Sequence, residues 1–139
     1  MRALQLAAAL FAVPAVACAQ AETAPNGIVD SFFRDLQAGD VTKAYQGVWA
    51  GTQMLTNKPA DVAMMASQTN SALQLYGKIH GWEPVKEDVV APSFRVQTHM
   101  LRTDLAPLFF RFQFYRKQDK WTVYRVDFAD QMSRLPSAP

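Results

Sequence analysis

The sequence predicts an α+β domain in which helices come first and an antiparallel sheet follows. Apolar residues recur at spacings of three and four between residues 28 and 76, which is the period of amphipathic helices. Between residues 94 and 128 they alternate at every second position, which is the period of strands. With 139 residues, 50% of them hydrophobic, the chain can form one packed domain. We place it at residues 22–135, with a frayed tail at 136–139.

The first 21 residues have the pattern of a secretory signal. Arg2 supplies the positive charge, residues 4–16 are apolar apart from Gln5, and residues 19–21 (Ala-Gln-Ala) form a small-x-small cleavage site. The apolar run is shorter than the ~18 residues that a membrane span requires, and no later stretch reaches that length. We therefore expect cleavage after Ala21 and a periplasmic or secreted protein.

Cys18, the only cysteine of the chain, gives an alternative for the same segment. Residues 16–18 (Val-Ala-Cys) resemble a bacterial lipobox, although Ala15 stands where leucine is usual. A lipoprotein anchored through Cys18 is therefore the minority alternative to a free periplasmic protein. A single cysteine also excludes a disulfide scaffold and a cysteine-based zinc site.

Two helices are expected between Asn26 and Gly51. Asn26 can cap the first helix and Gly39 lies where it stops, while Asp40 can cap the second helix and Gly51 can end it. The expected buried residues are Ile28, Val29, Phe32, Phe33 and Leu36 in the first helix, and Val41, Ala44, Tyr45, Val48 and Trp49 in the second.

A loop at residues 52–58 and a third helix are expected next. Asp61 fits the N-cap of this helix, and Gly77 can stop it. Its expected stripe is Val62, Met65, Ala66, Ala72, Leu73 and Tyr76.

Three strands are expected at residues 94–101, 108–115 and 121–128, with a short fourth strand at 85–90. We expect one face of the sheet to pack on the helices. The side chains assigned to this inner face are Phe94, Val96, Thr98 and Met100, then Leu108, Phe110, Phe112 and Phe114, then Thr122, Tyr124, Val126 and Phe128.

Two registers compete in the last hairpin. A two-residue loop, 118–119, would pair Phe112 with Arg125 and would bring charges into the phenylalanine face. A three-residue loop, 118–120, pairs Phe112 with Val126, and it sets Arg111 opposite Asp127 on the other face. We choose the three-residue loop, in which residue 119 or 120 takes a positive φ.

The order of elements resembles the NTF2-like superfamily, also called cystatin-like α+β cones. The likeness rests on residues 36–49 (LQAGDVTKAYQGVW) and on the terminal hairpin at residues 110–128 (FRFQFYRKQDKWTVYRVDF). Residues 76–83 (YGKIHGWE) also resemble a segment of small secreted bacterial proteins. The resemblance implies helices packed on a curved sheet. It does not imply one reaction, because such domains include isomerases, dehydratases and non-catalytic binding modules.

The sequence offers little for catalysis. His80 and His99 are far apart and lack metal-ligand spacing, and no nucleophile motif or phosphate loop is present, so we expect no catalytic residue, metal or cofactor. Asp127 is the natural carboxylate for the cone, but the chosen register turns it outward. A small apolar ligand could still enter the cone, where the expected polar lining is Tyr45, Tyr76, Thr98 and Tyr124.

The outer face of the sheet is the candidate interface. It is expected to carry Arg95, Arg111, Tyr115, Arg125 and Asp127, a mixture of arginine and aromatic residues that is typical of protein interfaces. We expect a homodimer or a protein partner there. Nucleic acid is disfavoured, because the net charge is only +2 and acidic residues are interleaved with the basic ones.

The predicted function is a non-catalytic periplasmic module that binds a ligand or a protein. Two alternatives remain: a small enzyme of the isomerase or dehydratase type that uses Tyr and Asp in the cone, and a lipid-anchored accessory subunit of an envelope assembly.

Overall fold

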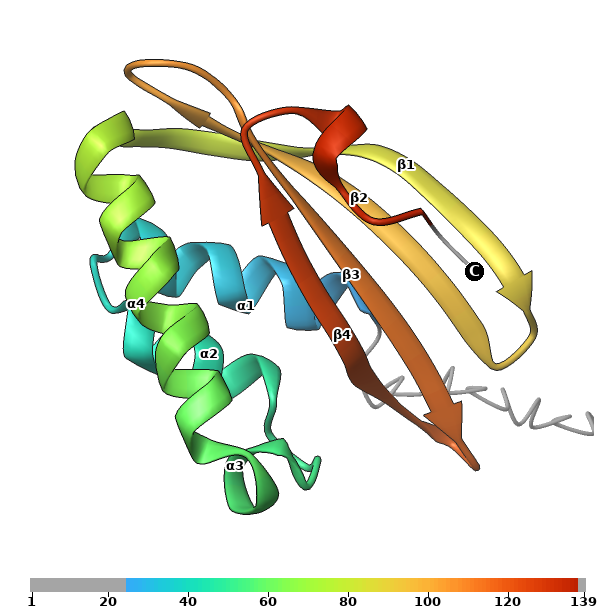
Figure 1. The fold of residues 1–139 in the computed structure, drawn as a ribbon. Coiled ribbons are helices and arrows are strands. Elements are labelled where there is room, and N and C mark those ends of the chain that lie inside the picture. The colour runs from blue at the N-terminus through green and yellow to red at the C-terminus, as the bar shows by residue number, and fades with distance from the viewer. Residues whose placement is uncertain (1–24, 138–139) are drawn as a thin grey trace, which may run out of the picture.

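The structure, a computed structural model, describes residues 25–137. Four helices precede a four-stranded antiparallel sheet and a final 3₁₀ turn (Figure 1). The α+β class predicted from the sequence is therefore confirmed. The predicted signal sequence and Cys18 lie outside the described residues. The helices are α1 (Pro25–Gln37), α2 (Val41–Val48), α3 (Met54–Asn57) and α4 (Pro59–Tyr76), and the strands are β1 (Ile79–Ala91), β2 (Phe94–Thr103), β3 (Leu108–Lys117) and β4 (Lys120–Ala129), followed by η1 (Met132–Arg134).

The first two helices agree with the prediction. Asp40 caps α2, because its Oδ1 accepts a hydrogen bond from the backbone N–H of Lys43 at 2.9 Å. Gly39 takes a φ of +84° in the turn between the helices, a conformation that glycine adopts without strain. Asn26 is not the cap of α1, since the helix already begins at Pro25, and its side chain bonds to β2 instead.

The third predicted helix begins earlier than expected. Part of the predicted loop forms α3, and Pro59 then opens α4. Proline suits a first helical position because it has a preset φ and its missing N–H would have no partner there. Asp61 therefore lies in the first turn of α4 rather than at its cap, where its charge favours the helix dipole.

The strands follow the order β1-β2-β3-β4, each antiparallel to the next. β1 is much longer than the predicted strand at 85–90, and it includes His80, which the sequence placed in a loop. Three register irregularities accompany its pairing with β2. These shifts mix the two faces along β1 and explain why its alternation is weak in the sequence.

The β3–β4 hairpin combines the two registers considered above. Next to the turn the loop has two residues, 118–119, with Lys117 opposite Lys120 and Gln118 at a φ of +60°. Tyr124 is then an extra residue, a bulge, since Phe114 pairs with Val123 while Gln113 pairs with Arg125.

Beyond the bulge the register is the predicted one. Phe112 pairs with Val126, Phe110 pairs with Phe128, and Arg111 stands opposite Asp127. Near the turn the predicted faces of β4 are wrong. Trp121 and Val123 lie on the helix side and are buried, whereas Thr122 shares the outer face with Tyr115.

The predicted faces of β2 are also inverted. Gln97 pairs with Phe112 and His99 with Phe110, so these polar residues share the inner face with the phenylalanines. Val96, Thr98 and Met100 consequently lie on the outer face. The polar side chains tolerate burial because they bond to one another and to α1, as described below.

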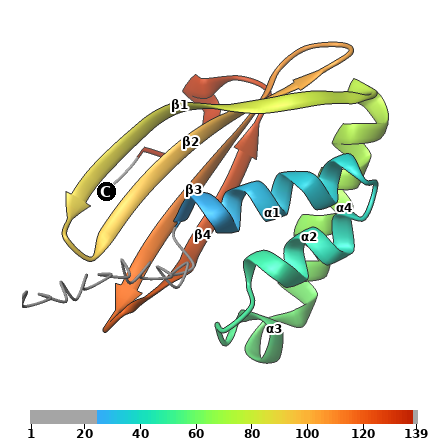
Figure 2. The ribbon, with the colours of Figure 1, turned by 180° about the vertical axis from the view of Figure 1, so that it is seen from behind.

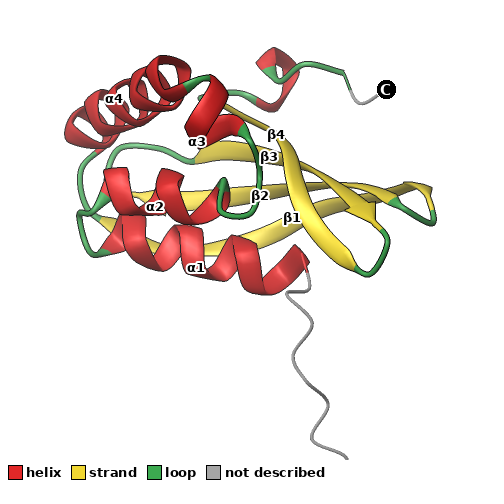
Figure 3. Ribbon diagram, turned by 90° about the horizontal axis from the view of Figure 1, so that it is seen from below, coloured by secondary structure: helices red, strands yellow, loops and turns green. Residues whose placement is uncertain are grey.

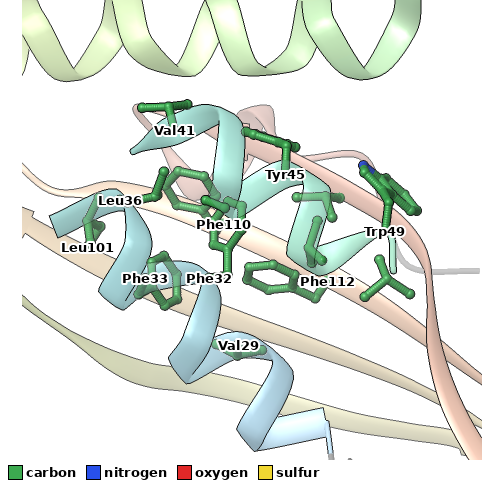
Figure 4. Packing of buried hydrophobic residues seen from close by; sticks show 14 of the residues in the cluster. Val29, Phe32, Phe33, Leu36, Val41, Tyr45, Trp49, Leu101, Phe110 and Phe112 are labelled. Atoms are coloured by element: carbon green, nitrogen blue, oxygen red, sulfur yellow. The ribbon is translucent and has the colours of Figure 1, made fainter. Parts of the chain in front are cut away.

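Aromatic rings fill the space between α1 and the sheet. Figure 2 shows α1 crossing this face of the strands, and Figure 4 shows the packing. The Phe32 ring lies 5.2 Å from Tyr45, 5.7 Å from Phe110 and 5.4 Å from Phe112, all in edge-on contacts that aromatic pairs favour. All four rings are at most 1% exposed.

The C-terminal segment, residues 131–137, crosses the opposite face of the sheet (Figure 3). Leu135 is buried, and the Arg111 guanidinium donates to the carbonyl of Pro136. Arg111 also donates to Thr98, so it links this segment to the outer face of β2. The chain is therefore held at least as far as Pro136, the first residue of the predicted frayed tail.

Candidate functional site

The four residues predicted to line a cone pocket do not converge. Tyr45 is fully buried, and its hydroxyl lies 2.7 Å from Thr69 Oγ1 in α4. Thr98 lies on the outer face, where its Oγ1 accepts from Arg111 Nε at 3.3 Å. Tyr124 projects from the bulge of β4 and is 65% exposed, and Tyr76 lies half-buried at the end of α4.

Tyr45 has a structural role in this arrangement. Burial raises the pKa of its hydroxyl to about 12, and the hydrogen bond with Thr69 only partly offsets that effect. The hydroxyl therefore stays neutral and ties α2 to α4, which otherwise has few buried side chains.

A buried polar cluster joins the start of α1 to the sheet, and the sequence analysis missed it. Gln97 Nε2 donates to Asn26 Oδ1 at 2.9 Å and to Glu87 Oε1 at 3.2 Å, and His99 Nε2 lies 3.2 Å from Gln97 Oε1. Burial lowers the pKa of His99, while the carboxylates of Asp30 and Glu87 partly oppose that shift. The neutral ring packs against Phe33 and Phe112 at 5.9 and 6.0 Å.

Most of these polar groups are bonded to one another, although the buried His99 Nδ1 has no partner among the described residues. Trp82 extends the cluster, because its ring stacks on Phe33 and its Nε1 donates to Asp30 at 3.0 Å. Among residues 25–137, no group of three or more metal-ligating side chains lies close enough together to hold a metal ion. The cluster fixes α1 on the sheet, and the sequence carries no local signal for it, because Gln97 and His99 follow Arg95 at every second position, like a solvent-facing row.

The outer face of the sheet carries most of the predicted interface residues. Arg111 and Tyr115 lie there, as do Arg125 and Asp127, whose side chains form an ion pair at 2.8 Å. Arg95 does not, because β2 is inverted. Its guanidinium lies 5.0 Å from the Trp121 ring on the inner face.

An exposed aromatic patch occupies the hairpin end of this outer face. We define the outer patch as Val90, Phe94, Tyr115 and Tyr124. Phe94 pairs with Tyr115 across β2 and β3, and its ring lies 5.9 Å from that of Tyr124. Val90, Tyr115 and Tyr124 are 48%, 44% and 65% exposed. A shallow hollow of about 530 Å³ lies between part of this patch and Ser137.

Helices packed on one face of an antiparallel sheet, with the outer face partly open, make this an α+β domain, which is the arrangement that the sequence resemblance implied. A solved structure from Thiobacillus denitrificans, described as a calcium/calmodulin-dependent protein kinase type II association domain, is similar to this chain. The two share 14% sequence identity at a TM-score of 0.53, over 78% of this chain and 95% of the other. At this identity the likeness shows the fold alone.

No family model matches the sequence, and no curated protein does. Among the helices of residues 25–137, none has the length and apolar character of a membrane-spanning helix.

Proposed function

We propose that this chain is a non-catalytic association module that pairs with a second copy of itself through the outer patch. The observation that carries the proposal is the grouping of Phe94, Tyr115 and Tyr124 on a sheet face that the helices leave uncovered. Contiguous exposed apolar groups of this kind mark interaction sites, and tyrosine is enriched at interfaces.

The filled core supports binding at the surface rather than chemistry inside the fold. The space between α1 and the sheet, where related folds could hold a substrate, is occupied by the rings of Phe32, Phe110 and Phe112. Asp127, the natural carboxylate for an enzyme, shares the outer face with Arg111 and lies 2.8 Å from Arg125.

The chemistry of the outer patch favours a second copy as the partner. Beside the aromatic rings lies the Arg125–Asp127 pair, which offers one charge of each sign. In a two-fold arrangement each surface meets its own copy, so arginine can face aspartate twice without leaving a charge unpaired. The description of the Thiobacillus protein as an association domain agrees with this mode of action.

Sedimentation velocity at micromolar concentration tests the proposal. We expect a dimer for the unaltered protein and a monomer for Tyr115→Glu and Tyr124→Glu, which place a carboxylate in the outer patch. Leu75→Glu is the matched control, because Leu75 is 72% exposed on α4, and it should leave the dimer intact. A monomeric unaltered protein would overturn the proposal.

We also propose that the module acts in the periplasm after loss of residues 1–21. The Ala-Gln-Ala sequence at residues 19–21 supports this. Intact-mass analysis of the exported protein should give a chain that starts at Glu22, whereas a chain that starts at a lipidated Cys18 would support the lipoprotein alternative.

A further inference from the structure

A cleft of about 730 Å³ separates α4 from the edge strand β4. It lies on the other side of β4 from the β3 strand, and it is also lined by Tyr45 of α2 and by Trp49, the residue that follows α2. The volume falls within the range of small-molecule sites, ~300–1,000 Å³. The cone filled by phenylalanine does not account for this cleft, and of the outer patch only Tyr124 lines it.

The cleft has apolar, adaptable walls and a polar rim. Met54, Met64 and Met65 line it from the helical side, and Val126 and Phe128 line it from β4. Methionine side chains are flexible and polarisable, so they fit irregular apolar ligands well. Met64 is 54% exposed, so its side chain is free to contact a molecule in the cleft.

One buried polar atom in the cleft lacks a partner. Trp49 is only 2% exposed, yet its indole Nε1 has no hydrogen-bond acceptor among the described residues. Figure 4 shows this nitrogen on the edge of the ring that is turned toward α4. A buried N–H that is left unpaired is unfavourable, so an acceptor would find a well-defined partner here. The Nε1 atom has almost no accessible surface in this structure, so a ligand oxygen reaches it only after a side chain that covers it moves aside.

We propose that the cleft between α4 and β4 binds an uncharged apolar molecule that carries a carbonyl oxygen, which accepts a hydrogen bond from Trp49 Nε1. The rim favours an uncharged ligand because it presents both signs of charge. Lys58 and Asp61 line it at the start of α4, and Arg125 and Asp127 form an ion pair on β4. Arg134 also lines it, and its charge is paired with Asp130. The apolar body of the ligand would contact the three methionines.

Acetophenone and ethylbenzene are suitable probes, because they share an aromatic ring and differ mainly in the carbonyl. The chain has three tryptophans, so heteronuclear NMR resolves three indole N–H signals, and Trp49→Phe assigns the one from Trp49. Acetophenone should shift this signal downfield, as a new hydrogen bond does, whereas ethylbenzene should not. The Trp82 indole, which already donates to Asp30, should stay in place with both probes.

Trp49→Phe should weaken acetophenone binding about fivefold, equivalent to ~1 kcal/mol for one neutral hydrogen bond, and leave ethylbenzene binding unchanged. Because Trp49→Phe changes the core and could disturb folding, two variants at exposed positions of α4 provide a second test. Gln68→Phe places a ring in the cleft and should abolish binding of both probes. Ser67→Phe, one residue earlier and ~100° around α4, places the same ring in a different hollow and should leave binding intact.

The proposal is overturned if acetophenone leaves the Trp49 indole signal in place. It is equally overturned if Gln68→Phe and Ser67→Phe bind acetophenone alike. Tyr124 belongs to both the cleft and the outer patch, so dimerisation is tested separately through Tyr115, which does not line the cleft, and both probes are also measured on the monomeric Tyr115→Glu variant.

Discussion

Replacing Phe112 by alanine removes the central ring of the core. The Phe112 side chain is 0% exposed and contacts aromatic rings from two directions. Its centroid lies 5.4 and 5.8 Å from Phe32 and Phe33 of α1, and 6.4 and 6.1 Å from Phe110 and Phe114 on its own strand. No neighbouring side chain can collapse into the space without moving α1 or the sheet.

The expected cost follows from the buried area of the ring. A phenylalanine side chain buries roughly 150–250 Å², worth about 4–6 kcal/mol at ~25 cal/mol per Å². Alanine retains a small part of that area and the cavity adds a penalty, so Phe112→Ala should lower the free energy of unfolding by about 3–5 kcal/mol. This is a large share of the ~5–15 kcal/mol that keeps a domain folded.

Urea denaturation at a concentration where the chain is monomeric measures this cost. Tyr115→Ala is the internal control, since Tyr115 lies on the opposite face of the same strand and is 44% exposed. We expect this control to cost only about 1 kcal/mol. If Tyr115→Ala proved the more damaging change, the assignment of faces on β3, and with it the outward position of Asp127, would be wrong.

Three further results are expected. His99 has a lowered pKa in the folded state, so protonation of its ring favours the unfolded chain. The stability that the neutral ring contributes is therefore present above pH 6.5, and it is lost as the pH falls through the lower pKa of the folded state. Urea midpoints measured between neutral and acidic pH should fall less steeply in His99→Gln. Asp40→Ala removes the cap of α2 and should lower the free energy of unfolding by about 1 kcal/mol, whereas Asp40→Asn should retain most of it. Gly77→Ala should cost about 1–3 kcal/mol in the same assay, because Gly77 has a φ of +84° and a Cβ there would lie 2.7 Å from Asp104 Oδ2. Gly47→Ala, within α2 and in open space, should not destabilise the chain.

The buried faces of the helices that contact the sheet were predictable, because burial alone determines the spacing of their apolar residues. Val29, Phe32, Phe33 and Leu36 of α1 are all at most 2% exposed, as their spacing indicated. α4 was harder to predict. Of its expected stripe only Val62 is fully buried, since α4 packs on α2 rather than on the sheet, and Thr69 is buried through its bond to Tyr45.

β2 shows why alternation alone misled the prediction of faces. Arg95, Gln97 and His99 look like a solvent-facing row, and Val96 and Thr98 look like a core-facing row. The inversion depends on contacts that are distant in sequence. Gln97 donates a hydrogen bond to Asn26, which lies 71 residues earlier in the chain, and on the outer face Arg111 bonds to Pro136. No local sequence pattern predicts either contact.

The candidate sites were predictable only in part for the same reason. Tyr115, Arg125 and Asp127 were placed on the correct face because the phenylalanines fix the register of β3 and of the far half of β4. Tyr124 was assigned to the cone because nothing local distinguishes a bulge from regular strand. The Trp49 indole looked like ordinary core, and only the packing of α4 shows that its nitrogen lacks an acceptor.

The bulge at Tyr124 makes the length of β4 adjustable by one residue. With Tyr124 present, the alternation of faces along β4 changes at the bulge. Odd-numbered residues, Trp121 and Val123, face the helices before it, and even-numbered residues, Val126 and Phe128, face them after it. Without it, a two-residue turn and uninterrupted pairing would bring Val126 opposite Phe112 just the same. A chain one residue shorter at this point could therefore build the same interior and would lose only an aromatic side chain from the exterior.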